Sequence, residues 1–178
     1  MILSVIEEGY RIPFIQQPPS MFFPNNRSAL RQATFVTKSI LQLLDSGRVT
    51  ELSTPAYVNS PLSVATSASK RRLILDLSRL NCYVKTYHFK IDDWKIGLQY
   101  LSPRALLASF DLKSGYHHVD IAPECQKFLG FSWPMDGKVR FFVFNVLPFG
   151  LSSAPYIFTK VLKPLVAHWR SAGLLIAV

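Results

Sequence analysis

Cysteines, acidic residues and long apolar segments are scarce in this sequence. Its 178 residues include two cysteines, Cys82 and Cys125, and no Cys-x-x-Cys pair or Cys/His cluster. This scarcity argues against a disulfide framework and a zinc site, and it is typical of a reducing compartment. No apolar run approaches the ~18 residues of a membrane span, and the start lacks the basic segment of a signal peptide. We therefore expect an intracellular protein, cytoplasmic or nuclear, with no membrane partner.

The hydrophobic content and the net charge narrow the class of protein further. Hydrophobic residues make up 49% of the chain, which excludes a disordered polar tail because such tails cannot bury enough apolar surface to fold. Lys and Arg number 20 against 11 Asp and Glu, for a net charge of +9. A basic balance favours a polyanionic partner, with nucleic acid ahead of a membrane surface.

Helical periodicity is clear in two stretches of the first 101 residues. Over 28–46 the apolar residues recur on one helical face, and Gly47 follows as a stop. A second amphipathic helix fits 92–101, with Asp92 as its N-cap.

A third helix is predicted near the end of the sequence. It begins after Ser152 or Ser153, carries Pro155 in its first turn and ends at Gly173. Because proline removes a backbone hydrogen bond, Pro164 is expected to kink or interrupt it.

Short apolar runs predict the strands. A hairpin turn is expected at Asp136-Gly137, where positive φ is tolerated, and an edge strand is expected around Val58 or Leu62. Residues 174–178 are expected to form a buried strand within which the sequence stops, which suggests a truncated chain. The full set of predicted strands, apart from the edge strand, is 73–77, 105–110, 128–133, 139–144 and 174–178. From 105 onward, the order of strands and helices fits the split βαβ arrangement of ferredoxin-like sheets.

Four motifs in this order resemble those of reverse transcriptases from retroelements, closest to the LTR and DIRS-like retrotransposon types. The motifs are Arg72–Asn81, Phe110–Tyr116, Phe128–Phe131 and Leu147–Phe158. The resemblance covers roughly residues 38–178. It implies an α+β fold that is a partial right-hand polymerase, with fingers and a ferredoxin-like split βαβ palm. Under this interpretation 1–49 form an N-terminal extension and helix, 50–104 the fingers and 105–178 a truncated palm.

The resemblance also implies a function and its partners. The full-length protein would be an RNA-directed DNA polymerase that binds an RNA or DNA template-primer and a dNTP, with thumb, RNase H and recombinase or integrase domains in the parent polyprotein. The family's aromatic-x-Asp-Asp motif is absent from the 178 residues. We therefore expect a fragment that is inactive by itself. The alternative is a non-catalytic nucleic-acid-binding remnant, or a domesticated or pseudogene fragment.

Asp111 is the expected catalytic carboxylate. Two-metal nucleotidyl transfer needs Mg²⁺ ions held by carboxylate and carbonyl oxygens, and Asp111 ends a predicted strand where phosphates can approach. By resemblance it is a metal ligand, with the Leu112 carbonyl as a second one. The alternative for Asp111 is an N-cap of the turn at 112–118.

Three residues after Asp111 are expected to contact the nucleotide. By resemblance Tyr116 is the steric gate against a 2′-hydroxyl, and Ser114 and Gly115 donate backbone N–H groups to the triphosphate. The alternative for Tyr116 is an ordinary buried tyrosine. His117 and His118 are expected to be surface or template-side residues.

Three further residues complete the expected nucleotide site. By resemblance Arg72 binds the β- and γ-phosphates, and Phe149 and Gly150 pack beside the incoming nucleotide. Arg72 has an alternative as part of a solvated basic edge strand, and its neighbours Lys70 and Arg71 are competing candidates. Without the family, Phe149 and Gly150 belong to a turn before a helix.

Overall fold

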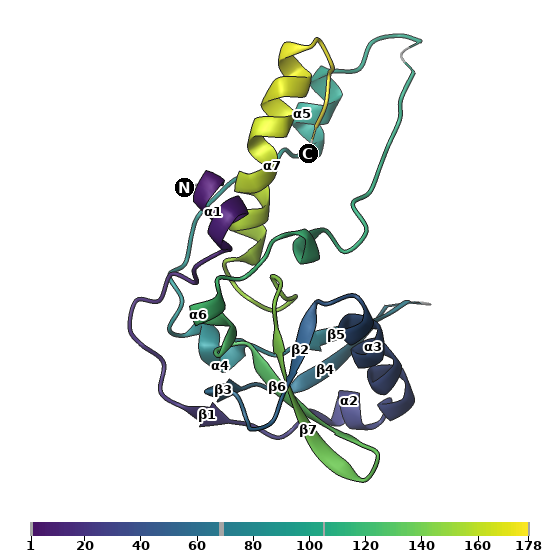
Figure 1. Cartoon of the computed structure of the whole chain (residues 1–178). Coiled ribbons are helices and arrows are strands. Elements are labelled where there is room, and N and C mark those ends of the chain that lie inside the picture. Colours follow the sequence, from purple (N-terminus) through teal and green to yellow (C-terminus); the bar gives the residue numbers. More distant parts are fainter. Residues whose placement is uncertain (1, 68–69, 105, 178) are drawn as a thin grey trace.

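The computed structural model describes residues 2–67, 70–104 and 106–177. Figure 1 shows a lower body built on β-sheets and a long C-terminal helix, α7, that extends away from it. In chain order the helices are α1 (Ile2–Glu8), α2 (Arg27–Leu30), α3 (Ala33–Asp45), α4 (Ser78–Asn81), α5 (Trp94–Gln99), the 3₁₀ helix η1 (Gly115–His118), α6 (Pro123–Gln126) and α7 (Ala154–Ser171). The mixed α+β composition confirms the predicted fold class.

A five-stranded sheet forms the lower body, in the order β1-β3-β6-β7-β2. Its strands are β1 (Met21–Phe22), β2 (Val49–Leu52), β3 (Val58–Asn59), β6 (Gly130–Met135) and β7 (Lys138–Phe144). The pairs β6–β7 and β7–β2 are antiparallel, whereas β3 runs parallel to both β1 and β6. The sheet therefore contains strands from each of the three predicted domain ranges, 1–49, 50–104 and 105–178.

The hairpin of β6 and β7 confirms the sequence-based expectation. Asp136 and Gly137 have φ angles of 52° and 75°, as a two-residue type I′ turn requires. Six residue pairs follow in register, from Met135 opposite Lys138 to Gly130 opposite Val143.

A separate two-stranded sheet pairs β4 (Leu62–Ser67) with β5 (Lys70–Leu75). It contains the predicted strand at 73–77, which begins earlier and ends at Leu75. Strands are present at both places where an edge strand was expected, but only β4 is an edge strand, because β3 lies between β1 and β6. The predicted helix over 28–46 is two helices, α2 and α3, separated at Arg31 and Gln32. The Trp133 Nε1 donates to Thr37 Oγ1 at 2.9 Å, which fixes α3 against the hairpin.

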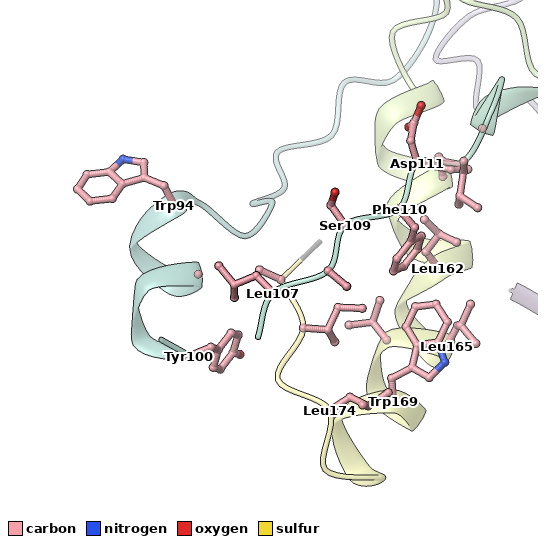
Figure 2. Close-up of a pocket in the computed structure, with 18 of the residues that line it drawn as sticks. Trp94, Tyr100, Leu107, Ser109, Phe110, Asp111, Leu162, Leu165, Trp169 and Leu174 are labelled. Carbon is pink, nitrogen blue, oxygen red and sulfur yellow. The ribbon is translucent and has the colours of Figure 1, made fainter. Parts of the chain in front are cut away.

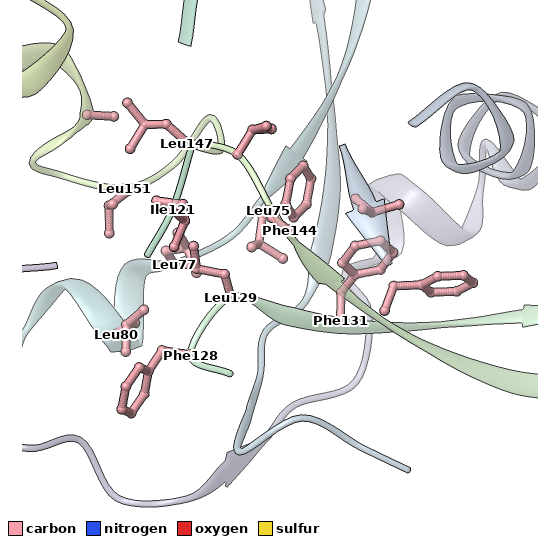
Figure 3. Packing of buried hydrophobic residues seen from close by; sticks show 14 of the residues in the cluster. Leu75, Leu77, Leu80, Ile121, Phe128, Leu129, Phe131, Phe144, Leu147 and Leu151 are labelled. Atoms are coloured by element: carbon pink, nitrogen blue, oxygen red, sulfur yellow. The ribbon is translucent and has the colours of Figure 1, made fainter. Parts of the chain in front are cut away.

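The hydrophobic core lies where the end of β5, α4 and the base of the hairpin meet. Figure 3 shows side chains from these elements packed together. Phe131 and Phe142 stack with ring centroids 5.1 Å apart, and both are fully buried. Because the hairpin is covered on this face, its apolar residues contribute the burial that stabilises the sheet.

The helix α7 confirms the predicted start and end. Its N-cap is Ser153, and Pro155 lies in the first turn. At the other end Gly173 has φ 86°, and the amides of Gly173 and Leu174 donate to Arg170 and Trp169, the two bonds of a Schellman motif. Pro164 does not interrupt the helix, which runs from Ala154 to Ser171, because proline removes only its own backbone donor.

Two predicted strands are wrong. Residues 106–110 and 174–177 have no regular secondary structure and pair with no strand in the part of the chain that the structure describes, and Ala105 and Val178 lie outside it. Leu107 and Leu175 are exposed, as is most of both segments. An apolar run forms a strand only when another strand satisfies its backbone groups. The two strands that flank the hairpin and α7 in a split βαβ palm are therefore not formed.

The predicted helix at 92–101 is shorter, and its cap is different. In α5 the Asp93 carboxylate, and not that of Asp92, accepts hydrogen bonds from the amides of Lys95 and Ile96. Asp92 instead forms an ion pair with Arg170 of α7.

Within 2–67, 70–104 and 106–177 no helix is both long and apolar enough to cross a bilayer.

Candidate functional site

An open groove of about 1740 Å³ runs beside α7. Its walls come from β4 and β5, α5, the segment 106–112, η1, the turn before α7, one side of α7 and the segment 174–177. Figure 2 shows apolar side chains of α7 and of the 106–110 segment along it, with Asp111 at one end. The groove is thus apolar over most of its length and polar where Asp111 and η1 meet it.

Seven of the eight predicted site residues line this groove. They come from β5, from the segment leading into η1, from η1 and from the turn before α7, and they are Arg72, Asp111, Leu112, Ser114, Gly115, Tyr116 and Phe149. The eighth, Gly150, lies beside Phe149 but is not part of the lining. The fold therefore brings together residues that are up to 77 positions apart (72 to 149) in the sequence.

Asp111 is exposed at the rim of the groove. The preceding Phe110 packs edge-on against Trp169 of α7, with ring centroids 5.7 Å apart. Figure 2 shows the Asp111 carboxylate pointing away from this aromatic contact. The helix η1 begins at Gly115 with Ser114 as its N-cap, so the alternative role of Asp111 as a helix cap is wrong.

The oxygen ligands of the groove do not fit a two-metal site. Asp111 is the only acidic side chain among the described residues that line it. Throughout the described ranges there is no group of three or more His, Cys, Asp or Glu side chains arranged to hold a metal. Two Mg²⁺ ions about 4 Å apart need more than one carboxylate to hold them, so Asp111 with the Leu112 carbonyl is too small a ligand set for a pair of ions.

Gly115 and Tyr116 are positioned by Phe158 of α7. A Cβ on Gly115 would lie 2.7 Å from Phe158 Cζ, so only glycine fits at this position without displacing the ring. The Tyr116 ring contacts Phe158 with centroids 5.3 Å apart and Phe149 with centroids 5.0 Å apart. Burial raises the pKa of Tyr116, so its phenol stays protonated and the ring acts as a neutral wall of the groove.

The turn before α7 is held by Asn81 of α4. The Asn81 amide donates to the Gly150 carbonyl at 2.9 Å and accepts from the Ser152 amide at 2.9 Å. Gly150 has φ 116°, and a Cβ there would lie 2.1 Å from the Leu75 carbonyl oxygen. The close approach that requires glycine at 150 is therefore to β5.

Arg72 is the member of the basic triplet that faces the groove. Arg71 lies on the other side, with its guanidinium 5.2 Å from the Phe35 ring of α3 and within 3.5 Å of Gln32 Oε1. The alternation follows from the strand, because neighbouring side chains in β5 point to opposite faces. Arg72 is exposed, so its guanidinium is accessible to an anion in the groove.

Sequence reasoning missed the contacts that hold these residues in place. Asn81 lies within a recognised motif, but its bonds to residues about 70 positions later leave no local pattern. Phe158 belongs to the predicted apolar stripe of α7, and the glycine at 115 is the signal that a bulky group approaches there. His117 was expected at the surface or on the template side, and it is half-buried against Phe149.

Comparison with protein families gives a match over residues 64–178 to the family described as reverse transcriptase (RNA-dependent DNA polymerase). Among curated proteins, the genome polyprotein of Petunia vein clearing virus is 34% identical over 93 residues, covering 52% of this chain and 4% of the polyprotein. The Pol polyprotein from transposon gypsy of Drosophila melanogaster is 30% identical over 135 residues, 72% of this chain and 12% of the polyprotein.

Among solved structures, this chain is similar to the foamy viral protease-reverse transcriptase in complex with an RNA/DNA hybrid. The TM-score is 0.63 at 20% identity, over 88% of this chain and 20% of the other. The similarity supports the same fold. The chain spans from 4% to 12% of the two polyproteins above and 20% of the foamy viral chain.

Proposed function

The chain belongs to the reverse transcriptase family, and on that premise we propose that it is the nucleotide- and template-binding part of a retroelement RNA-directed DNA polymerase. In this proposal 1–49 are an N-terminal extension, 50–104 contribute the fingers and 105–178 contribute the palm. Its partners are an RNA or DNA template-primer and a dNTP, and its metal is Mg²⁺.

The groove beside α7 is the observation that carries this proposal. Arg72, Tyr116 and Phe149 approach one open space from three segments, and Asp111 lies at its rim. A guanidinium there can donate two parallel hydrogen bonds to phosphate oxygens. Two aromatic rings on the same side offer a flat surface for a sugar and base. A cation and aromatic rings around a space open to solvent match the chemistry of a nucleoside triphosphate.

Each residue has a role in the proposal. Tyr116 excludes a 2′-hydroxyl, Arg72 binds the β- and γ-phosphates, and Ser114 and Gly115 donate backbone N–H groups to the triphosphate. Phe149 packs beside the nucleotide, and Gly150 keeps the turn close to β5. Asp111 and the Leu112 carbonyl bind a single Mg²⁺.

We propose that these 178 residues bind nucleic acid without extending a primer. The reason is electrostatic, because charge that develops in phosphoryl transfer needs fixed positive charge to balance it. A groove with one carboxylate does not hold the two ions that supply such charge. A primer-extension assay on a primed RNA template, with Mg²⁺ or Mn²⁺, should therefore show no product.

Binding and extension should be measured on the same preparation. We expect an RNA–DNA duplex to bind with an affinity that falls steeply as salt rises, since the net charge is +9 and phosphate contacts release counterions. Arg72→Ala should weaken binding of a dNTP, with Arg71→Ala as the matched control that points to the opposite face. Extension that is abolished by Asp111→Asn would contradict the proposed inactivity, and salt-independent binding would contradict the nucleic-acid role.

A second candidate function is a nucleic-acid-binding remnant that never catalyses. The single acidic side chain at the groove favours it. The two candidates differ in one result, because a remnant should bind the duplex with no preference for an added dNTP. The polymerase part should form a tighter complex when the dNTP matches the template base.

A further inference from the structure

His117 is half-buried behind the groove, next to the contact between the Tyr116 and Phe149 rings. Its ring centroid lies 5.4 Å from that of Phe149 and 6.3 Å from that of Phe144, the last residue of β7. Its Nδ1 is buried and has no hydrogen-bond partner within the residues that the structure describes. A buried nitrogen without a partner costs about 1–3 kcal/mol, so this position is poorly suited to stability alone.

The neighbouring His118 has a different environment. It is exposed, and its Nε2 lies 3.3 Å from the Lys113 carbonyl oxygen. The two histidines lie on the 3₁₀ helix η1, where successive side chains are about 120° apart. His117 is therefore turned inward while its neighbour faces solvent.

The charge of His117 follows from its surroundings. Burial lowers the pKa of His117 to about 4, and the nearby charge of Arg48 and the neighbouring His118 act in the same direction. The ring is thus uncharged at neutral pH and behaves as a flat apolar group. A positive charge at this place would be partly desolvated and would lie near the cationic Arg48.

Phe149 links this histidine to the proposed sugar gate. The Phe149 ring meets the His117 ring in a T-shaped contact, with the two planes at 63°, and also contacts Tyr116 at a tilt of 40°. Phe149 is 36% exposed and lines the groove, so part of its ring faces open space. Without a ring at position 117, Phe149 loses the aromatic contact that holds it against Tyr116.

We propose that His117 is a positioning residue whose uncharged ring holds Phe149 against Tyr116 and thereby sets the shape of the sugar side of the groove. The inference rests on the proposed function, because it concerns the residue that we assign as the gate. It adds a specificity-determining residue that does not itself touch the nucleotide.

A pair of variants with similar volume isolates the role of the ring. His117→Phe keeps a flat ring, whereas His117→Leu fills the site with a branched chain, and both remove the buried nitrogen. His118→Leu is the matched control on the exposed neighbour. All three should melt cooperatively, and a merely structural role would affect the Phe and Leu variants alike.

The first readout needs no nucleotide. NOE cross-peaks between the Tyr116 and Phe149 rings should persist in wild type, His117→Phe and His118→Leu, and should weaken or vanish in His117→Leu. Unchanged cross-peaks in His117→Leu would overturn the proposal, regardless of the results of the nucleotide-binding measurements.

The second readout is sugar discrimination. The ratio of the dissociation constants for GTP and dGTP, measured on the complex with a primed RNA template, should fall about tenfold in His117→Leu and stay within about twofold in His117→Phe. Equal ratios in all variants would overturn the proposal. If the cross-peaks change but wild type binds neither nucleotide, the proposed function fails and the role of His117 in holding Phe149 stands.

Discussion

The hairpin of β6 and β7 and the segments 106–110 and 174–177 have similar apolar sequences and different structures. Phe142 in the hairpin is fully buried, whereas Phe110 is 66% exposed. The hairpin carries its own partner through the turn at Asp136 and Gly137, and β2 and β3 pair with its outer edges. The two segments pair with no strand among the described residues.

The comparison shows that an apolar run specifies burial only together with a partner. Period and composition are local properties, but the hydrogen bonds of a strand come from another part of the chain. In the hairpin the apolar pattern and the partner strand both lie within 15 residues, from 130 to 144. The same physical difference predicts which substitutions the molecule should tolerate.

The largest effect should come from the hairpin core. Phe142→Ala should lower the free energy of unfolding by about 3–5 kcal/mol, because it removes a fully buried ring and leaves a cavity. Phe110→Ala should cost less than about 1 kcal/mol, since that ring is mostly exposed and loses one aromatic contact. Urea unfolding of both variants measures the difference. Equal losses would mean that the 106–110 segment is buried in solution.

A smaller loss is expected at the turn before α7. Gly150→Ala should destabilise the protein by about 1–3 kcal/mol, because φ 116° is strained for alanine and its Cβ meets the Leu75 carbonyl. Gly97→Ala in α5 is the matched control, because no atom lies within 4 Å of its added Cβ. That control should stabilise the helix by about 0.5–1 kcal/mol. Thermal melts that rank the two variants in the opposite order would contradict the described turn.

Asn81 tests the link between α4 and the same turn. Asn81→Ala removes two hydrogen bonds to the turn and should cost about 1–2 kcal/mol. Arg79→Ala, at an exposed position of the same short helix, should be close to neutral. Chemical denaturation distinguishes the two, and a neutral Asn81→Ala would show that the turn is held by other contacts.

The smallest effect concerns charge at the edge of the hairpin. Arg140 of β7 forms an ion pair with Glu51 of β2 and donates hydrogen bonds to its carboxylate. These hydrogen bonds lower the pKa of the Glu51 carboxyl. A lowered folded pKa means that the stabilisation is present above the unfolded value of 4.5 and is lost as pH falls through the folded value. Glu51→Gln should therefore lower stability at pH 7 by about 0.2–1 kcal/mol, because the pair is partly exposed.

The pH dependence provides the control for that prediction. Below the folded pKa of Glu51 the wild type and Glu51→Gln should have the same unfolding free energy, as measured by urea titration at several pH values. A gap that persists in strong acid would show that the substitution acts through packing and not through charge.

The sequence predicted those features whose determinants are local. The hairpin could be predicted from its turn dipeptide, and the bounds of α7 from Pro155 at its start and Gly173 at its end. The groove residues could be predicted because they belong to four motifs that occur in the order typical of the family. The two absent strands were mispredicted because the sequence of a segment does not show whether another strand is available to pair with it. The roles of Asn81 and Phe158 depend on contacts between distant segments, which a single sequence does not display.

The position of His117 illustrates the same limit. It was expected at the surface or on the template side, but the 3₁₀ helix η1 directs its ring toward Phe149. The turn itself depends on Ser114, whose φ of 55° is uncommon for a residue with a side chain.

The most direct test of the account is to map where a nucleotide binds. Amide shifts of the chain on a primed RNA template should be recorded as dGTP and Mg²⁺ are added, with Asp111→Asn as the comparison. The account predicts shifts concentrated at Arg72, Ser114, Gly115 and Tyr116, reduced in Asp111→Asn. Shifts that spare these residues, or a spectrum that dGTP leaves unchanged at every concentration, would contradict it.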